Sequence, residues 1–81
     1  MTQRTSALHS PADFGLAIRE ARLDRGLSQA QLAEILDLPQ STISEIEGGK
    51  STIYLRRLLT LARATGISFT ANWEGDDEAR G

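Results

Sequence analysis

The chain has 81 residues, enough for one small domain, and its formal net charge is −2. The absence of cysteine excludes disulfides and thiolate metal sites, and a single histidine, His9, argues against a histidine metal cluster. The sequence offers no glycine-rich phosphate loop, activated nucleophile or plausible carboxylate pair, so we expect neither an enzyme nor a cofactor. A chain this short often gains stability by association, and we expect a homodimer.

No apolar run approaches the ~20 residues of a membrane helix, and the first ten residues lack the apolar stretch of a secretory signal. These features predict a cytoplasmic protein. The last eight residues, EGDDEARG, hold four of the eleven acids and one of the nine basic residues. Residues 74–81 are therefore predicted to form an acidic disordered tail, which either solubilises the chain or contacts a basic partner.

Residues 1–9 are predicted to be a flexible leader, and residues 10–66 to form four helices. The first helix begins at the N-cap Ser10, with Pro11 in its first turn, and ends at Gly26. Ser28 caps the second helix, and Gln31 completes a capping box. No glycine separates the second and third helices. Pro39 forces a short break there, about the length of a helix-turn-helix turn.

The third helix, PQSTISEIEGG, has only Ile43 and Ile46 as strongly apolar residues, so we expect a narrow inner seam and a broad polar outer surface. The fourth helix, STIYLRRLLTLARATG, is capped by Ser51 or Thr52 and ends at Gly66.

Residues 67–73, ISFTANW, alternate in the manner of a β-strand. The residues on its apolar face are Ile67, Phe69, Ala71 and Trp73. Because a lone strand leaves its backbone groups unpaired and the sequence suggests no second strand, we expect this strand to pair antiparallel with its copy in a homodimer. The alternative is a short fifth helix or an irregular arm packed on the domain.

The segment LSQAQLAEILDLPQSTISEIEGGK resembles the lambda-repressor/Cro-like (XRE) helix-turn-helix family across roughly residues 11–66. The stretch STIYLRRLLTLARATGISFTANW is in addition similar to the HipB-type antitoxins. The resemblance implies a mainly α fold, a four-helix lambda-repressor-like DNA-binding domain with one C-terminal strand pairing across a homodimer. It also implies two partners, a palindromic double-stranded DNA operator and a HipA-like kinase toxin.

In such a fold the N-terminal residues of the third helix meet base edges in the major groove. The expected base-reading residues are Gln40, Ser41, Thr42 and Ser44. A glutamine amide can form a bidentate pair with adenine, worth ~1–3 kcal/mol of discrimination. Taken alone, these polar residues would more often be a solvated helix face. The expected phosphate-contacting residues are Gln29, Lys50, Ser51 and Thr52.

Arg22 and Glu47 correspond to a family pair that ties the first helix to the end of the recognition helix, and two unrelated surface charges are the alternative. Glu45 fits less well, because an acid in the groove either accepts from cytosine or is repelled by phosphate. Arg4 could reach DNA as an arm or remain disordered. Arg56 and Arg57 are expected to be solvated or to contact a protein partner.

Three functions are compatible with these features. The first is a DNA-binding antitoxin that represses its own operon and neutralises a HipA-like kinase. The second is a free-standing transcriptional repressor of the same fold. The third is a protein-interaction adaptor that no longer binds DNA, which the negative net charge and Glu45 would favour.

Overall fold

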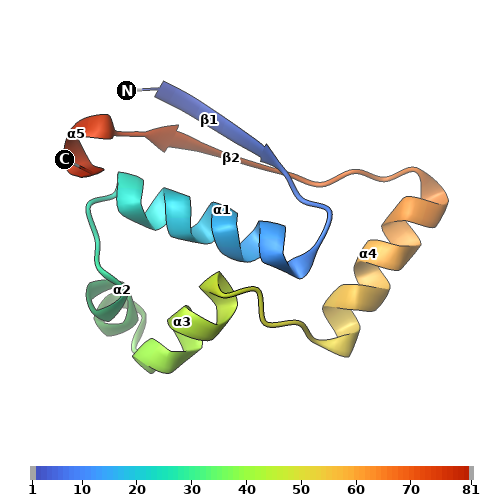
Figure 1. The fold of residues 1–81 in the computed structure, drawn as a ribbon, viewed down its shortest axis with the longest axis horizontal. Helices are drawn as coiled ribbons and strands as arrows, with labels where there is room; N and C mark the ends of the chain where they lie inside the picture. The colour runs from blue at the N-terminus through green and yellow to red at the C-terminus, as the bar shows by residue number, and fades with distance from the viewer. Residues whose placement is uncertain (1, 81) are drawn as a thin grey trace.

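The computed structural model describes residues 2–80, and this part of the chain forms five helices and one two-stranded sheet (Figure 1). In chain order the elements are β1 (Thr2–Ala7), α1 (Pro11–Asp24), α2 (Gln29–Leu36), α3 (Gln40–Glu47), α4 (Ile53–Thr65), β2 (Thr70–Gly75) and α5 (Asp77–Arg80). The molecule is elongated, with extents of 40 × 30 × 16 Å. Among residues 2–80 no helix has both the length and the apolar character needed to cross a membrane.

Helix α1 is the central element, with the sheet along one side and α2 and α3 on the other (Figure 1). It begins as predicted, because Pro11 occupies its first turn and the Ser10 hydroxyl accepts a 3.2 Å hydrogen bond from the Asp13 amide. The end of α3 lies directly against α1 at Gly15. A Cβ atom at this position would lie 2.2 Å from the carbonyl oxygen of Ile46. Only a residue without a side chain therefore allows the two helices to approach this closely.

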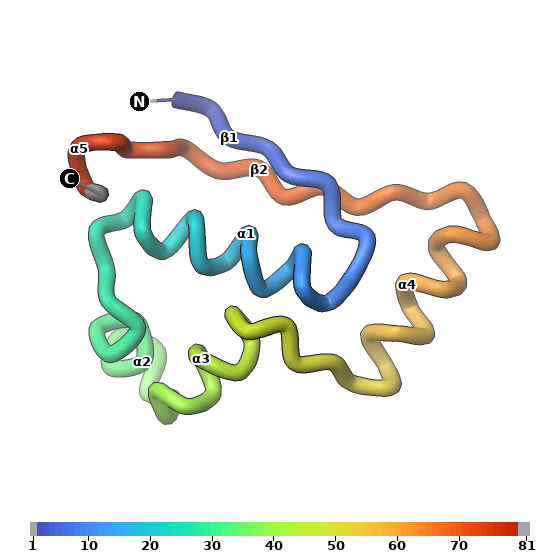
Figure 2. The backbone as a smooth tube through the Cα atoms, viewed as in Figure 1, coloured from blue at the N-terminus to red at the C-terminus, as the bar shows by residue number. Residues whose placement is uncertain are grey.

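The two ends of the chain run side by side (Figure 2). Strand β1 pairs antiparallel with β2, with Thr2 opposite Gly75 and Ala7 opposite Thr70. The prediction of a flexible leader at residues 1–9 is thus wrong for residues 2–7, and a second strand does exist in the chain. Its sequence, TQRTSA, lacks the apolar alternation that is typical of a strand. The pairing with β2 and the contacts of Arg4 specify the strand instead.

Strand β2 begins and ends later than the predicted strand at residues 67–73. Ala71 and Trp73 are half-buried, whereas Ile67 precedes the strand and is 57% exposed. Phe69 also precedes it and packs against Phe14, with 6.4 Å between the ring centroids. Because β2 has a partner within the chain, the reason for expecting it to pair with a second copy no longer holds.

The predicted acidic disordered tail is ordered over most of its length. Glu74 and Gly75 belong to β2, and Asp77–Arg80 forms the short helix α5. The prediction is wrong for residues 74–80, and residue 81 lies outside the described residues. The Asp76 side chain caps this turn by accepting hydrogen bonds from the amides of Glu78 and Ala79.

A buried carboxylate joins both ends of the chain to α1. The side chain of Asp24 is fully buried and accepts hydrogen bonds from Arg4 Nε at 2.8 Å and from Trp73 Nε1 at 2.7 Å. Asp24 also accepts from the Asp76 amide at 3.3 Å, and Arg4 pairs in addition with Asp77. The Asp24 carboxylate, and then that of Asp77, raise the pKa of Arg4. Arg4 is therefore held in the fold and is not a free arm.

The helices bury some of their apolar residues and expose others. Ala33 and Leu59 are 5% and 4% exposed, but Ile35 and Leu36, on α2, are 66% and 51% exposed. Helix α4 stands to one side of the α1–α3 body (Figure 1). A substantial apolar surface of the described chain is consequently left in contact with solvent.

Asp24→Asn is expected to lower the free energy of unfolding, because Arg4 would lose one of its two carboxylate partners and Trp73 Nε1 would lose its charged acceptor. Urea denaturation followed by circular dichroism measures the change. Glu34→Gln, at an exposed position on α2, is the control and should stay within about 0.5 kcal/mol of the wild type. Equal effects of the two substitutions would contradict the anchoring role of Asp24.

Candidate nucleic-acid interface

The turn between α2 and α3 is short and is built without glycine. The capping box predicted for α2 is confirmed, because Ser28 Oγ accepts from the Gln31 amide at 3.0 Å and Gln31 Oε1 accepts from the Ser28 amide at 2.8 Å. Asp37 ends α2 in the left-handed conformation, with φ 54° and ψ 45°. Aspartate is one of the few residues besides glycine that adopts it readily. Pro39 then precedes α3, and no side chain caps this helix.

Helix α3 presents a polar face to solvent. Gln40, Ser41 and Ser44 are exposed, while Ile43 is 5% exposed. Thr42 is half-buried at the edge of this face. The structure thus brings three of the four predicted base-reading residues to one open surface, and turns Thr42 partly towards the protein.

A buried ion pair fixes α3 against α1. Arg22 Nε lies 2.7 Å from Glu47 Oε2, and Arg22 Nη2 lies 2.9 Å from Glu47 Oε1. The two side chains are 8% and 3% exposed. Arg22 Nη1 also donates to the carbonyl oxygen of Leu27 at 2.7 Å, which ties in the chain leading to α2. This bidentate geometry sets both the distance and the angle between the helices.

The ion pair shifts the titration of both partners. The Arg22 guanidinium lowers the pKa of the Glu47 carboxyl against the opposing effect of burial, and the Gln29 amide lowers it further. The Glu47 carboxylate in turn raises the pKa of Arg22. Both groups are therefore charged throughout the neutral range.

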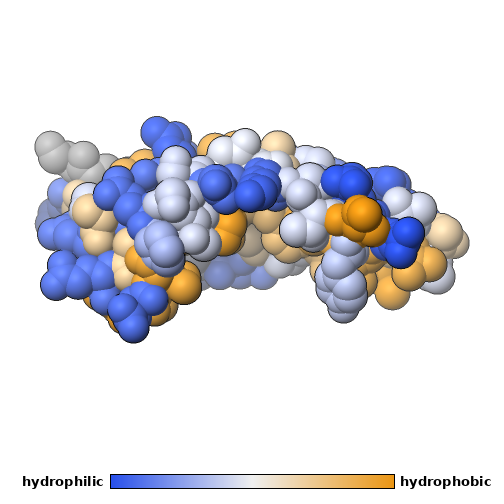
Figure 3. Space-filling view, turned by 90° about the horizontal axis from the view of Figure 1, so that it is seen from below, coloured by the Kyte–Doolittle hydropathy of each residue, from blue (hydrophilic) through white to orange (hydrophobic). Residues whose placement is uncertain are grey.

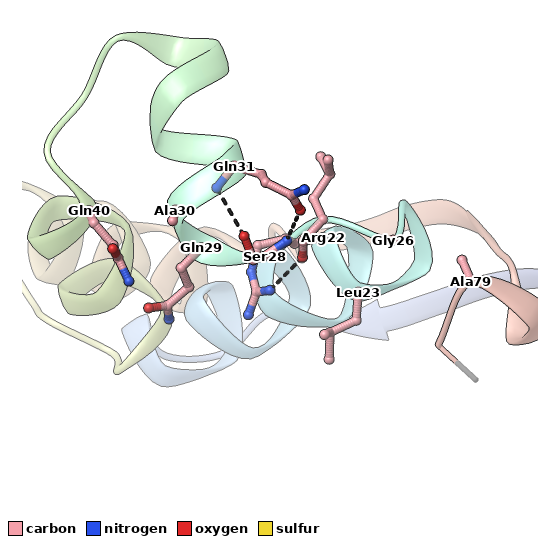
Figure 4. A pocket seen from close by; sticks show the side chains of 10 residues that line it. Arg22, Leu23, Gly26, Ser28, Gln29, Ala30, Gln31, Gln40 and Ala79 are labelled. Carbon is pink, nitrogen blue, oxygen red and sulfur yellow. Dashed lines mark hydrogen bonds between the residues drawn. The ribbon is translucent and has the colours of Figure 1, made fainter.

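Gln29 connects this ion pair to the outer surface. Its Nε2 donates to Glu47 Oε1 at 3.1 Å, which uses one of the two hydrogens on that nitrogen. Gln29 and Gln40 line the same shallow hollow, of about 590 Å³, at the starts of α2 and α3 (Figure 4). The hollow gathers amide groups that can both donate and accept, next to the positive end of the α2 dipole.

Lys50 and Glu45 are paired on the surface beside α3. Lys50 Nζ lies 2.8 Å from Glu45 Oε2, and both side chains are more than half exposed. The acid that fitted the recognition surface poorly is thus drawn towards a neighbouring cation. A phosphate group approaching Lys50 would compete with Glu45 for it.

The two hydroxyl residues of the loop after α3, Ser51 and Thr52, accept hydrogen bonds from different kinds of donor. Thr52 caps α4 by accepting from the Leu55 amide at 3.2 Å, whereas Ser51 Oγ accepts from Arg56 Nη1 at 2.8 Å. Arg56 therefore lies at this loop, near Lys50 in sequence, and adds a further cation to it. Sequence reasoning assigned Arg56 to solvent or a protein partner. Its place at the first turn of the fourth helix was the available signal.

Gly15 is the other residue that sequence reasoning missed. It lies on α1 where the backbone of α3 comes closest. A glycine among the apolar positions of a helix was the signal that another backbone packs there.

Glu47→Gln is expected to lower the free energy of unfolding by about 3 kcal/mol at pH 7, because Arg22 would stay buried without a counter-charge. The pKa of Glu47 is lowered on folding, so its stabilising effect is fully present above its usual value of 4.5 and is lost as the pH falls through the lowered value. The stability difference between the wild type and Glu47→Gln should therefore shrink below about pH 4.5. Urea titrations from pH 7 to pH 3 measure it, and a pH-independent difference would contradict this assignment.

Comparisons with known proteins agree with this geometry. The family model described as "Helix-turn-helix" (HTH_3) matches residues 18–72. Residues of this chain are 39% identical over 56 positions to multiprotein-bridging factor 1a of Arabidopsis thaliana, covering 69% of this chain and 39% of that protein.

Two bacterial relatives match a longer segment. Uncharacterized HTH-type transcriptional regulators of Rickettsia conorii and Rickettsia prowazekii are each 33% identical over 66 residues, covering 82% of this chain and 53% and 51% of the respective relatives. The chain thus spans about half the length of these relatives or less. No solved structure gives a significant match. The matched residues include all of α2, α3 and α4, so the chain belongs to the helix-turn-helix family.

Proposed function

We propose that this protein is a transcriptional regulator that binds a specific double-stranded DNA site through α3. The observation that carries the proposal is the exposed face of Gln40, Ser41 and Ser44 on a helix that a buried ion pair holds rigidly in place. A side chain can discriminate between base edges only if its helix has a fixed position, because bidentate hydrogen bonds tolerate little displacement. The names of the two Rickettsia relatives, both HTH-type transcriptional regulators, support the same function.

Gln40 is the main base-reading residue in this proposal, with adenine as its preferred base. Ser41 and Ser44 contact base edges or phosphates, and Thr42 offers its methyl group or hydroxyl from the edge of the face. Gln29, Lys50, Ser51 and Thr52 hold the DNA backbone. Arg56 joins this group because its guanidinium already lies at Ser51. Such phosphate contacts fix the register but carry no sequence information.

A palindromic operator and a homodimer belong to the same proposal. Two copies related by a two-fold axis would present two α3 helices to half-sites about one helical turn apart, ~34 Å. DNase footprinting of the region upstream of the gene tests this. A protected palindrome with that spacing is the expected result. An adaptor that does not bind DNA would protect nothing.

The antitoxin role is a more specific prediction than DNA binding and transcriptional regulation. The three relatives described above are a bridging factor and two transcriptional regulators, so a free-standing repressor is equally consistent with them. A kinase-like gene next to this one, whose product forms a complex with the chain, would decide for a HipA-like toxin partner. Its absence would decide for the free-standing repressor.

Gln40→Ala is expected to weaken binding to the operator by about 1–3 kcal/mol and to leave binding to unrelated DNA unchanged, because it removes a base contact and no charge. Its melting temperature should match that of the wild type, since Gln40 is exposed. Fluorescence anisotropy with operator and scrambled duplexes measures both affinities. An equal loss on both duplexes would refute the base-reading role.

Glu45→Gln is expected to strengthen binding to any DNA sequence, because it removes a negative charge from the DNA-facing surface and releases Lys50 for phosphate. The slope of the logarithm of the binding constant against the logarithm of the salt concentration should become steeper, by up to the amount expected for about one additional phosphate contact. Glu34→Gln, an exposed charge change on α2, is the matched control. If Glu45→Gln instead weakened binding only to operators with cytosine at one particular position, Glu45 would be a residue that reads cytosine.

A further inference from the structure

We infer that a stripe on α4 is a self-association surface, on which α4 of a second copy of this chain packs about a two-fold axis. The inference deepens the proposed function, because it names the element that joins two DNA-binding copies. The stripe consists of Tyr54, Leu58 and Leu61, which are 78%, 38% and 63% exposed. Spacings of four and three residues place the three side chains on one face of a helix.

The stripe lies on a different face of α4 from the residues that this helix buries in its own chain. These buried residues are Leu59 and Ala62, which are 4% and 5% exposed. At about 100° per residue, the stripe lies roughly a quarter-turn around the helix from these two residues. The space-filling view shows apolar side chains gathered at the end of the molecule that α4 forms (Figure 3).

The chain exposes more area than a compact monomer of its mass. A monomeric protein of 8.8 kDa is expected to expose about 4,800 Å², whereas this chain exposes 5687 Å². The excess of about 900 Å² is close to the ~800 Å² that each partner contributes to an interface of standard size. The excess is spread over the exposed apolar residues of the chain, and the stripe on α4 contributes one part of it.

The chemistry of the stripe favours another α4 as its partner. The three side chains are uncharged and include an aromatic residue, which is typical of the centre of an interface. The charges of α4 come from Arg56, Arg57 and Arg63, and α4 contains no acid. Two such helices can associate through their apolar stripes while the arginines extend into solvent. Salt, which screens repulsion between these arginines, should then strengthen the dimer, although it weakens DNA binding.

The position of α4 is also compatible with DNA binding. Gln40, Ser41 and Ser44 are on a different helix, so packing of α4 against its copy leaves the recognition face free. The two α3 helices would lie on either side of the two-fold axis, as a palindromic site requires.

Sedimentation equilibrium in the absence of DNA tests the surface. The wild type is expected to be a dimer, and Leu61→Glu a monomer with an unchanged circular dichroism spectrum. Ile35→Glu is the matched control, because Ile35 is similarly exposed, at 66%, but lies on α2. It should remain dimeric. A monomeric wild type, a dimeric Leu61→Glu variant, or loss of the dimer in both variants would overturn the inference.

A cysteine placed in the stripe tests the like-to-like geometry. The natural chain has no cysteine, so Leu58→Cys introduces a single thiol at the middle of the stripe. Mild oxidation is expected to convert Leu58→Cys to a disulfide-linked dimer faster than it converts Ile35→Cys. The reason is that a disulfide requires Cα atoms ~4.4–6.8 Å apart. Equal cross-linking of the two variants would refute α4–α4 packing.

The two proposals can fail separately. Leu61→Glu should bind the full operator more weakly but keep the wild-type discrimination between a single half-site and scrambled DNA, because its α3 is unchanged. A dimer that ignores DNA sequence would overturn the proposed function and leave the α4 interface standing. A wild-type monomer that discriminates a half-site from scrambled DNA would overturn the α4 interface and leave the proposed function standing.

Discussion

The buried ion pair between Arg22 and Glu47 is the interaction on which the rest of the site depends. It joins the end of α3 to α1, accepts Gln29 of α2 as a third member, and reaches the chain before α2 through the Leu27 carbonyl. Desolvating two charges is costly, and a pair of apolar residues could stabilise the same contact equally well. What apolar residues would not supply is the directional, bidentate geometry that holds a recognition helix at one angle.

The last turn of α1 anchors two sides of the molecule at once. Arg22 and Asp24 are two residues apart, so their side chains leave the helix in nearly opposite directions. Arg22 binds the helix-turn-helix unit, whereas Asp24 binds Arg4 and Trp73, and through them both strands. The sheet and α3 are thus both anchored to the last turn of α1. The same arrangement explains why the short strands are ordered although they carry little apolar surface.

The distribution of polar and apolar surface separates the tasks of the domain. Helix α3 turns amides and hydroxyls outward, and the Glu45–Lys50 pair at its edge keeps the acid from acting as a bare negative charge. Helix α4 turns Tyr54, Leu58 and Leu61 outward at the end of the molecule that it forms. The polar groups proposed to bind in a groove and the apolar groups proposed to pack against a copy are thus on different helices. A chain close to electrical neutrality can bind a polyanion in this way, because its contacts are local.

The sequence by itself determined the four central helices, their caps and the polar face of α3. These features follow from local chemistry, such as the Ser28–Gln31 capping box, which acts within one or two turns. The inner seam expected for α3 is only half correct, because Ile43 is buried whereas Ile46 is 42% exposed. Only the tertiary structure decided which conformation the two ends of the chain adopt. The strand at residues 2–7 has no apolar pattern of its own, and Asp24 reads as an ordinary helix-end acid until Arg4 and Trp73 surround it. The close contact at Gly15 and the exposure of Ile35 and Leu36 were likewise undetermined, because they depend on how whole helices pack, which residue spacing along one helix does not specify.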